Sequence, residues 1–220
     1  MREVLIADDH PLFRDALKRA VLTSWPHALL READSVPALQ QLIDAHPDAE
    51  LLLLDLHMPG ASGFSALVHM RSQHPGLPII VVSAHEEASA MTRAIAHGAS
   101  GYIPKSASVA AIVEAVRGVL AGDVWLPAPA ANLGSTLPPA EADAAARISD
   151  LTPQQFRVLM MIAEGLLNKQ IAYELCVSEA TVKAHMTAIM RKLGVGNRTQ
   201  VALLASHLAL DGEVLASPAA

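Results

Sequence analysis

The first half of the chain alternates short apolar runs with amphipathic stretches. The pattern predicts strands at 3–8, 28–33, 51–55, 78–83 and 100–103, and helices at 11–23, 36–45, 63–73, 86–97 and 107–121. The four leucines just before Asp55 do not alternate with polar residues, which is typical of a strand buried on both faces. Five strand–helix units in series predict a parallel sheet with right-handed crossovers and helices on both faces.

The pattern changes after residue 122. A Pro- and Ala-rich segment, 123–148, is interpreted as a linker with a turn or two of helix near its end; its prolines are Pro127, Pro129, Pro138 and Pro139. Helical patterns resume at 153–164, 168–175, 179–193 and from about 198 to 208, and 211–220 is a tail. Residues 176–178 have the length of the turn in a helix-turn-helix.

Local signals mark the ends of these later helices. Thr152 with Gln155, and Asn197 with Gln200, have the spacing of capping boxes. Gly165 and Gly194 follow the first and third helices, where a left-handed residue commonly ends a helix. These signals predict four short helices in the C-terminal domain.

Composition limits the class of protein. The chain has 220 residues, 52% of them hydrophobic and 3% aromatic, which favours helices and α/β layers over an all-β fold. We expect no membrane span and no signal peptide, because no apolar run is long enough and a strand-like segment begins at Val4. Cys176 is the one cysteine and is expected to be a buried small hydrophobe. Together these features favour a cytoplasmic protein.

Charge is unevenly distributed along the chain. The net charge is −6, but residues 149–208 carry six Lys or Arg against four Asp or Glu and form the cationic segment. In the predicted third helix of that segment, Lys183, Thr187 and Arg191 recur every four residues on one face. Such a face can enter the DNA major groove, and an ordinary solvated face is the alternative. Three further cations suit phosphate contacts: Lys169, Lys192 and Arg198.

Polar side chains follow four of the predicted strands. Asp8 and Asp9 end the first strand, and Asp55 ends the third; Ser83 ends the fourth, and Lys105 follows the fifth. Because the carboxyl ends of parallel strands share one edge of a sheet, we expect these five residues to meet there. Crowded carboxylates with room for water suit Mg²⁺. The set predicts phosphoryl transfer to Asp55, with Lys105 and Ser83 holding the phosphoryl oxygens.

Residues 1–122 resemble the receiver domain of bacterial two-component systems. The matching segments are 7–10, 54–60, 82–84 and 98–105. The resemblance implies a flavodoxin-like sheet of strand order 2-1-3-4-5 and a sensor histidine kinase that phosphorylates Asp55. It further implies that Asp9, Asp55 and the His57 backbone carbonyl bind Mg²⁺, with Asp8 acting through water. Ser83 and Tyr102 would form the switch pair.

Residues 149–210 resemble the LuxR-type helix-turn-helix. The matching segments are 151–153, 168–172, 177–185 and 192–200, with Gly165. Together with the receiver, this arrangement is similar to the NarL/FixJ class of response regulators. The resemblance places Lys183, Ala184 and Thr187 against DNA bases, includes Thr181 in the DNA-binding set, and gives the last helix a dimer contact.

The chain departs from the LuxR-type pattern at several positions. Gln155 and Gln170 stand where Glu is usual, Leu167 replaces a common Ser or Thr cap, and Arg157 replaces an acidic residue. Cys176 replaces a Gly or Asn in the turn and would cost on the order of 1 kcal/mol if its φ is positive. These departures bear on affinity and stability rather than on class.

Taken together, these features predict a non-enzymatic transcriptional regulator that is controlled by phosphorylation and binds DNA as a dimer. Two rivals stay open: an aspartyl-phosphate phosphatase, which would want an acid where His57 stands, and a DNA-binding protein with a receiver indifferent to phosphorylation. His57 and His85, two residues after Asp55 and Ser83, are either neighbours of the phosphoryl group or surface histidines without a role.

Overall fold

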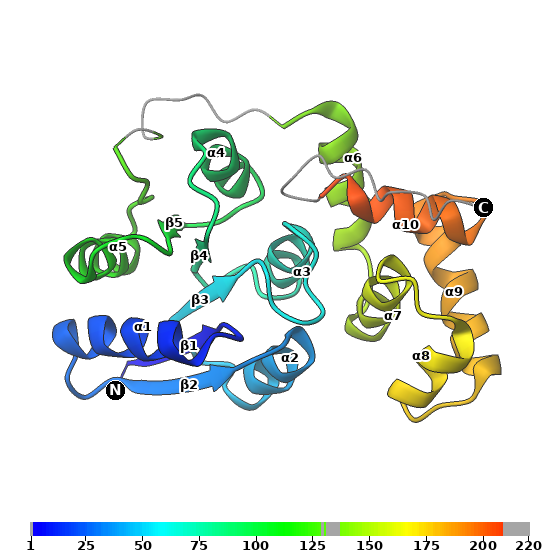
Figure 1. Cartoon of the computed structure of the whole chain (residues 1–220), viewed down its shortest axis with the longest axis horizontal. Helices are drawn as coiled ribbons and strands as arrows, with labels where there is room; N and C mark the ends of the chain where they lie inside the picture. Colours follow the sequence, from blue (N-terminus) through cyan, green and yellow to red (C-terminus); the bar gives the residue numbers. More distant parts are fainter. Residues whose placement is uncertain (1, 129, 131–136, 209–220) are drawn as a thin grey trace.

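A computed structural model of the chain describes residues 2–128, 130 and 137–208. Residues 3–121 form an α/β unit, and 139–208 form a helical unit (Figure 1). The predicted tail, 211–220, lies outside the described residues, as do Pro129 and residues 131–136 of the predicted linker. Within the described part of the chain, no helix has the length and apolarity that a membrane crossing requires.

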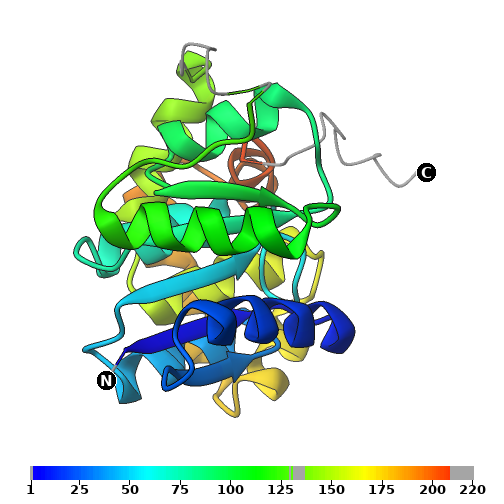
Figure 2. The same ribbon diagram turned by 90° about the vertical axis from the view of Figure 1, so that its left-hand side faces the viewer.

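The α/β unit contains five parallel strands in the order β2-β1-β3-β4-β5, which confirms the predicted sheet. The strands are β1 Glu3–Ala7, β2 Leu29–Ala33, β3 Leu51–Asp55, β4 Ile79–Ser83 and β5 Gly101–Pro104. The helices are α1 Pro11–Ser24, α2 Val36–Ala45, α3 Ser65–Gln73, α4 Ala88–Ala96 and α5 Val109–Ala121. Helices α1 and α5 lie side by side on one face of the sheet (Figure 2).

The central strand β3 is buried on both faces, as its leucines predicted. Leu51 and Leu53 pack in the core beneath α1 and α5, whereas Leu52 and Leu54 pack in the core on the opposite face, with α2, α3 and α4. A strand of this kind can present a functional group only at its end. β3 ends at Asp55, which is fully buried.

The helical unit consists of α6 Pro139–Ser149, α7 Pro153–Ala163, α8 Asn168–Glu174, α9 Glu179–Leu193 and α10 Arg198–Ser206. Thr152 and Gln155 form the predicted capping box, and Gly165 and Gly194 take positive φ where α7 and α9 end. α6 is a longer helix than the turn or two expected in the linker. At the start of α8, Leu167 has no polar side-chain atom, so only the Gln170 half of a capping box forms.

Cys176 differs from one expectation and meets another. Its side chain is exposed, so the prediction of a buried hydrophobe is wrong. The reason is its place in the turn between α8 and α9, where the side chain points away from the core. Its φ of 51° lies in the left-handed region that was anticipated for this position.

The two units share one continuous apolar core. Core residues of the sheet face that carries α2, α3 and α4 connect directly with those of α6, α7, α9 and α10. The Phe64 backbone N–H donates to the Leu208 carbonyl at 2.8 Å, and the Ser65 hydroxyl lies 3.3 Å from Met160 Sδ. The helical unit therefore packs against α3 rather than being carried on a free linker.

Candidate functional site: the acidic edge of the sheet and the outer face of α9

The predicted strand-end residues meet at one edge of the sheet. Asp8 and Asp55 are fully buried, and the Lys105 ammonium lies 2.9 Å from Asp8 Oδ2 and 2.8 Å from Asp55 Oδ2. Burial by itself lowers the pKa of Lys105, but its hydrogen bonds to Asp55 and Asp8 outweigh burial and raise that pKa above its usual value. Lys105 is therefore a fixed positive charge beside the carboxylate that sequence analysis selected.

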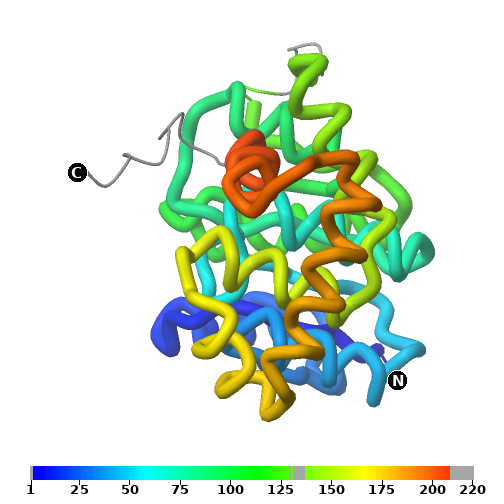
Figure 3. The backbone as a smooth tube through the Cα atoms, turned by 90° about the vertical axis from the view of Figure 1, so that its right-hand side faces the viewer, coloured from blue at the N-terminus to red at the C-terminus, as the bar shows by residue number. Residues whose placement is uncertain are grey.

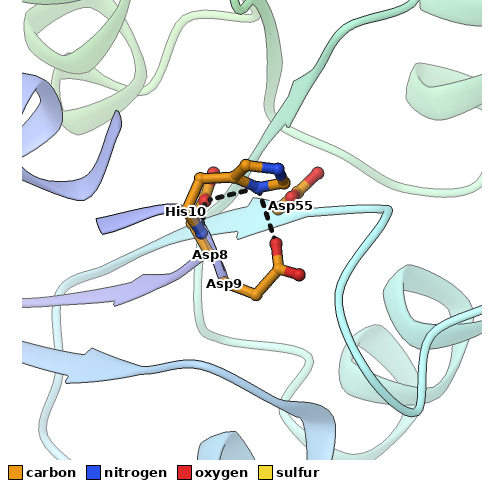
Figure 4. Close-up of side chains that lie close together, drawn as sticks. All are labelled: Asp8, Asp9, His10 and Asp55. Carbon is orange, nitrogen blue, oxygen red and sulfur yellow. Dashed lines mark hydrogen bonds and ion pairs between the residues drawn. The ribbon is translucent and has the colours of Figure 1, made fainter. Parts of the chain in front are cut away.

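His10 belongs to this cluster and was not among the predicted residues. Its Nδ1 lies 2.7 Å from Asp9 Oδ1 and 3.5 Å from Asp8 Oδ1 (Figure 4). Ligand atoms of Asp8, Asp9, His10 and Asp55 all lie within 4.8 Å of one another, close enough to hold one metal ion. The position of His10 directly after the Asp8–Asp9 pair was the available sequence clue. His10 is three residues past the end of β1, however, and a side chain there can point in many directions.

The backbone after each strand orients the carboxylates. The His10 N–H donates to Asp8 Oδ1 at 2.7 Å, and the His57 N–H donates to Asp55 Oδ1 at 3.1 Å. Three carboxylates face one another with a single lysine among them. This donor set fits a hard divalent cation such as Mg²⁺, which accepts oxygen ligands and neutralises the excess negative charge.

Ser83 and Tyr102 lie on the neighbouring strands β4 and β5, and both are buried. The Tyr102 hydroxyl donates to the His85 carbonyl at 2.8 Å, and burial raises the pKa of Tyr102 to about 12. The Ser83 hydroxyl lies 3.3 Å from His85 Nδ1. The Tyr102 ring is thus buried, and its hydroxyl is linked to the segment that follows Ser83.

His57 and His85 lie together beside the acidic edge. Their rings stack with centroids 4.8 Å apart and planes 13° apart. His57, with Lys105 and Phe13, also lines the opening above Asp55. The two histidines that the sequence placed after Asp55 and Ser83 are therefore close to each other and to the acidic site.

The helix-turn-helix presents a polar face away from the sheet. α9 packs on α6, α7, α8 and α10 through Val182, Met186, Ile189 and Leu193, which are buried as predicted. The side chains of Thr181, Lys183, Ala184 and Thr187 are exposed on its other side. In Figure 3, α8 and α9 lie on the side of the molecule away from the sheet. The face that the sequence assigned to DNA is therefore not covered by the α/β unit.

The three cations expected at phosphates differ in their surroundings. Lys169 is exposed at the start of α8. The Lys192 ammonium donates to the Asp150 carbonyl at 2.8 Å, and the Arg198 guanidinium donates to Asn168 Oδ1 at 3.1 Å and to the Leu166 carbonyl. Burial lowers the pKa of Arg198 below its usual value. Lys192 and Arg198 thus hold the helical unit together, a role that spacing alone does not reveal.

Comparison with known proteins assigns the family. Residues 4–117 match the family of the response regulator receiver domain, and residues 149–205 match the luxR family of bacterial regulatory proteins. The chain is 38% identical over 213 residues to the glycerol metabolism activator of Pseudomonas putida, covering 94% of this chain and 96% of that protein. It is 30% identical over 205 residues to the nitrate/nitrite response regulator NarL of Escherichia coli K12, covering 91% and 93%.

This chain is a response regulator of the NarL/FixJ class. It is a transcriptional regulator with a DNA-binding helix-turn-helix rather than an enzyme, so the phosphatase alternative is set aside. In fold, the regulator is similar to RcsB of Salmonella enterica serovar Typhimurium in a promoter-bound structure, with a TM-score of 0.55, 24% identity, and coverage of 94% of this chain and 99% of that chain.

Proposed function

We propose that a sensor histidine kinase phosphorylates Asp55 and that this modification controls DNA binding by the helical unit. The observation that supports it best is the placement of Lys105 between the buried carboxylates of Asp8 and Asp55. In the transfer, an Asp55 carboxylate oxygen attacks phosphorus and the P–N bond to the kinase imidazole breaks. The leaving nitrogen recovers the electron pair of that bond, and the imidazole leaves neutral, with its one proton either already on the other ring nitrogen or taken up from solvent. The Lys105 ammonium and the Ser83 hydroxyl then hold the phosphoryl oxygens.

The acidic edge would hold one Mg²⁺ ion through Asp9, Asp55 and the His57 carbonyl, with Asp8 acting through a water molecule. The bound ion supplies neutralisation of the negative charge that gathers on the phosphoryl group during transfer. The crowding of Asp8, Asp9 and Asp55 within 4.8 Å is the feature that supports this assignment.

Phosphorylation would act through the face made by α4, β5 and α5. Ser83 and Tyr102 link Asp55 to the start of α4, because the Tyr102 hydroxyl holds the backbone of His85. A shift in this face changes how the receiver, 1–122, holds the linker, 123–148, and the DNA-binding domain, 149–210. Leu203 on α10 is 56% exposed, which suits the proposed dimer contact of the last helix.

Asp55→Asn tests the chemical part of the proposal. The protein is incubated with Mg²⁺ and acetyl phosphate, and its intact mass and DNA binding are measured. We expect a phosphoryl adduct and tighter DNA binding in the wild type, and neither change in Asp55→Asn. Asp44→Asn, at an exposed carboxylate of α2, is the matched control and should behave as the wild type. DNA binding that is the same in Asp55→Asn as in the wild type, both with and without phosphodonor, would support the phosphorylation-independent alternative.

Substitutions in the helical unit test the DNA contacts. Lys183→Ala is expected to weaken binding to the preferred sequence by about 1–3 kcal/mol and to relax specificity, because its ammonium would donate to base edges. Lys169→Ala should instead weaken binding to all sequences and reduce the salt dependence by about one ion. A selection for bound sequences supplies the DNA. Equal effects of the two variants on specificity would remove the assignment of α9 as the base-reading helix.

A further inference from the structure

Helix α3 presents a buried histidine to the helical unit. His69 is fully buried, and its ring stacks on Phe156 of α7 with centroids 4.1 Å apart and planes 2° apart. Ser65 of α3 meets Met160 of α7 beside it. We call this set, His69 and Ser65 against Phe156 and Met160, the α3–α7 contact. Its central polar group is a buried imidazole that lies flat against an aromatic ring.

Neither ring nitrogen of His69 has a hydrogen-bond partner among the residues that the structure describes. A neutral imidazole carries one N–H and is tolerated in such a place at a modest cost. An imidazolium would carry two N–H groups and a full charge into the same apolar space, where neither is compensated. Protonation is therefore compatible only with an arrangement in which water reaches the ring.

The charged groups around this contact do not offset an imidazolium. On α3, Arg71 donates to the carbonyls of Pro75 and Leu77. His74, at the end of the same helix, disfavours further positive charge at His69.

On α6, the charged groups are paired with other residues. Glu141 binds Arg93 and His97 of the receiver, and Arg147 pairs with Asp143.

The remaining groups lie on α7 and α10. Arg157 of α7 and Glu164, just after that helix, line a cleft beside Phe156 that faces α2 and the loop after β3. Arg198 and His207 lie at the two ends of α10. Burial lowers the pKa of His69 to about 4, and His74 adds to the shift; no carboxylate raises it.

We propose that the α3–α7 contact is an acid-sensitive closure: protonation of His69 separates the helical unit from the receiver without any phosphoryl group on Asp55. Because the Phe64 N–H binds the Leu208 carbonyl across the same interface, separation also frees the end of α10. The ligand of this regulatory site is the proton. The site lies between the two units, apart from both the acidic edge and the outer face of α9.

The direction of the pH dependence follows from the difference in the His69 pKa between the closed and separated forms. His69 binds a proton with a pKa near 6.5 when exposed in the separated form and of about 4 when closed. The closed form is fully favoured above the exposed value and loses its advantage as the pH falls from about 6.5 towards 4. Between pH 7.5 and pH 5.5, the ratio of separated to closed molecules should rise about tenfold through this one group.

The Phe64 amide provides a direct measurement. Its hydrogen-exchange protection factor, corrected for the intrinsic exchange rate at each pH, reports the ratio of closed to separated molecules, because its hydrogen-bond acceptor belongs to the other unit. The experiment uses the full-length chain carrying Asp55→Asn, so its outcome does not depend on the proposed phosphorylation. We expect protection at Phe64 to fall about tenfold more than protection at Leu53, in the central strand, between pH 7.5 and 5.5.

His69→Phe is the decisive variant, because phenylalanine keeps an aromatic ring against Phe156 and cannot be protonated. His97, which is buried and has a pKa lowered mainly by burial, titrates in both proteins, so the readout is the difference between them. We expect the pH-induced fall at Phe64 to be about tenfold smaller in His69→Phe than in the parent. His27→Phe, at an exposed loop histidine, should retain the full effect.

An equal fall in His69→Phe and its parent, or no fall in either, would overturn the proposal. If His69→Phe does not fold, His69→Leu provides the same comparison. Preserved protection at Leu53 in every variant shows that the separation is local rather than a loss of the receiver fold.

Discussion

At the acidic edge, Lys105 lies between the buried carboxylates of Asp8 and Asp55, whereas at the α3–α7 contact, His69 stacks on Phe156 and has no polar partner among the described residues. Both regions bury ionisable groups in the same receiver. In the first, hydrogen bonds to the two carboxylates raise the pKa of Lys105, so a positive charge lies beside the proposed phosphoryl acceptor. In the second, burial alone favours the neutral form, so a change of charge disrupts packing. Whether a buried titratable group serves chemistry or sensing thus depends on its partner.

Of the substitutions that test this comparison, removal of Lys105 should change stability most. We expect Lys105→Met to lower the free energy of unfolding by about 3–5 kcal/mol, because it leaves buried carboxylates without a positive charge. Chemical denaturation at pH 7 measures it. Lys18→Met is the matched control: Lys18 also bridges two carboxylates, Asp15 and Glu32, but these are 57% and 38% exposed, so the loss should be much smaller than in Lys105→Met. Equal losses in both variants would mean that the buried ion pairs of Lys105 contribute no more to stability than the exposed ion pairs of Lys18.

Truncating the aromatic partner should weaken the inter-unit packing next. Phe156→Ala removes the ring that stacks on His69. We expect the free energy that favours the closed form to fall by about 3 kcal/mol, or to vanish if it is smaller than that in the parent. Protection of the Phe64 amide measures the change. Leu203→Ala, at an exposed apolar residue of α10, should leave that protection within about twofold. A Phe156→Ala protein with unchanged protection would show that the α3–α7 contact does not hold the units together.

A paired buried charge also spans the two units. Glu141 of α6 is 4% exposed and accepts hydrogen bonds from Arg93 Nε, while its Oε1 lies 2.6 Å from His97 Nε2. Glu141→Gln should weaken closure by about 2 kcal/mol, less than a fully buried pair because Arg93 can reach water. The Phe64 amide is again the probe. Asp143→Asn, which breaks an exposed pair with Arg147 on the same helix, should change closure by less than about 0.5 kcal/mol.

The smallest expected effect lies outside both regions. Cys176→Gly should stabilise the helical unit by about 1 kcal/mol, because glycine adopts a φ of 51° without the steric cost that a Cβ imposes. Thermal unfolding measures the gain. Cys176→Ser keeps the Cβ and should leave the midpoint nearly unchanged; if serine stabilises as much as glycine, the thiol rather than the backbone is responsible.

The meeting of the strand-end residues at the acidic edge could be predicted because it depends only on where the strands end and on their parallel arrangement. Asp55, Ser83 and Lys105 follow successive apolar runs, and right-handed crossovers carry the ends of parallel strands to one edge. His10 was missed because its side-chain direction depends on a backbone hydrogen bond to Asp8, which no periodicity encodes. Lys192 and Arg198 were assigned to phosphates by charge, and in the structure they also donate to carbonyls of the segments between helices, at Asp150 and Leu166.

The sequence by itself determined the parallel sheet, the residues at the strand ends and the division of α9 into a core face and an outer face, because these follow from local periodicity and chain chirality. The strand order was implied by the resemblance to receiver domains. Tertiary structure alone decided that His69 is buried. In α3, six consecutive residues from Ser65 to Met70 are buried, since the receiver covers one side and the helical unit covers the other. A polar residue on a short helix predicts an exposed side chain, and only the packing of a distant segment against it removes the water.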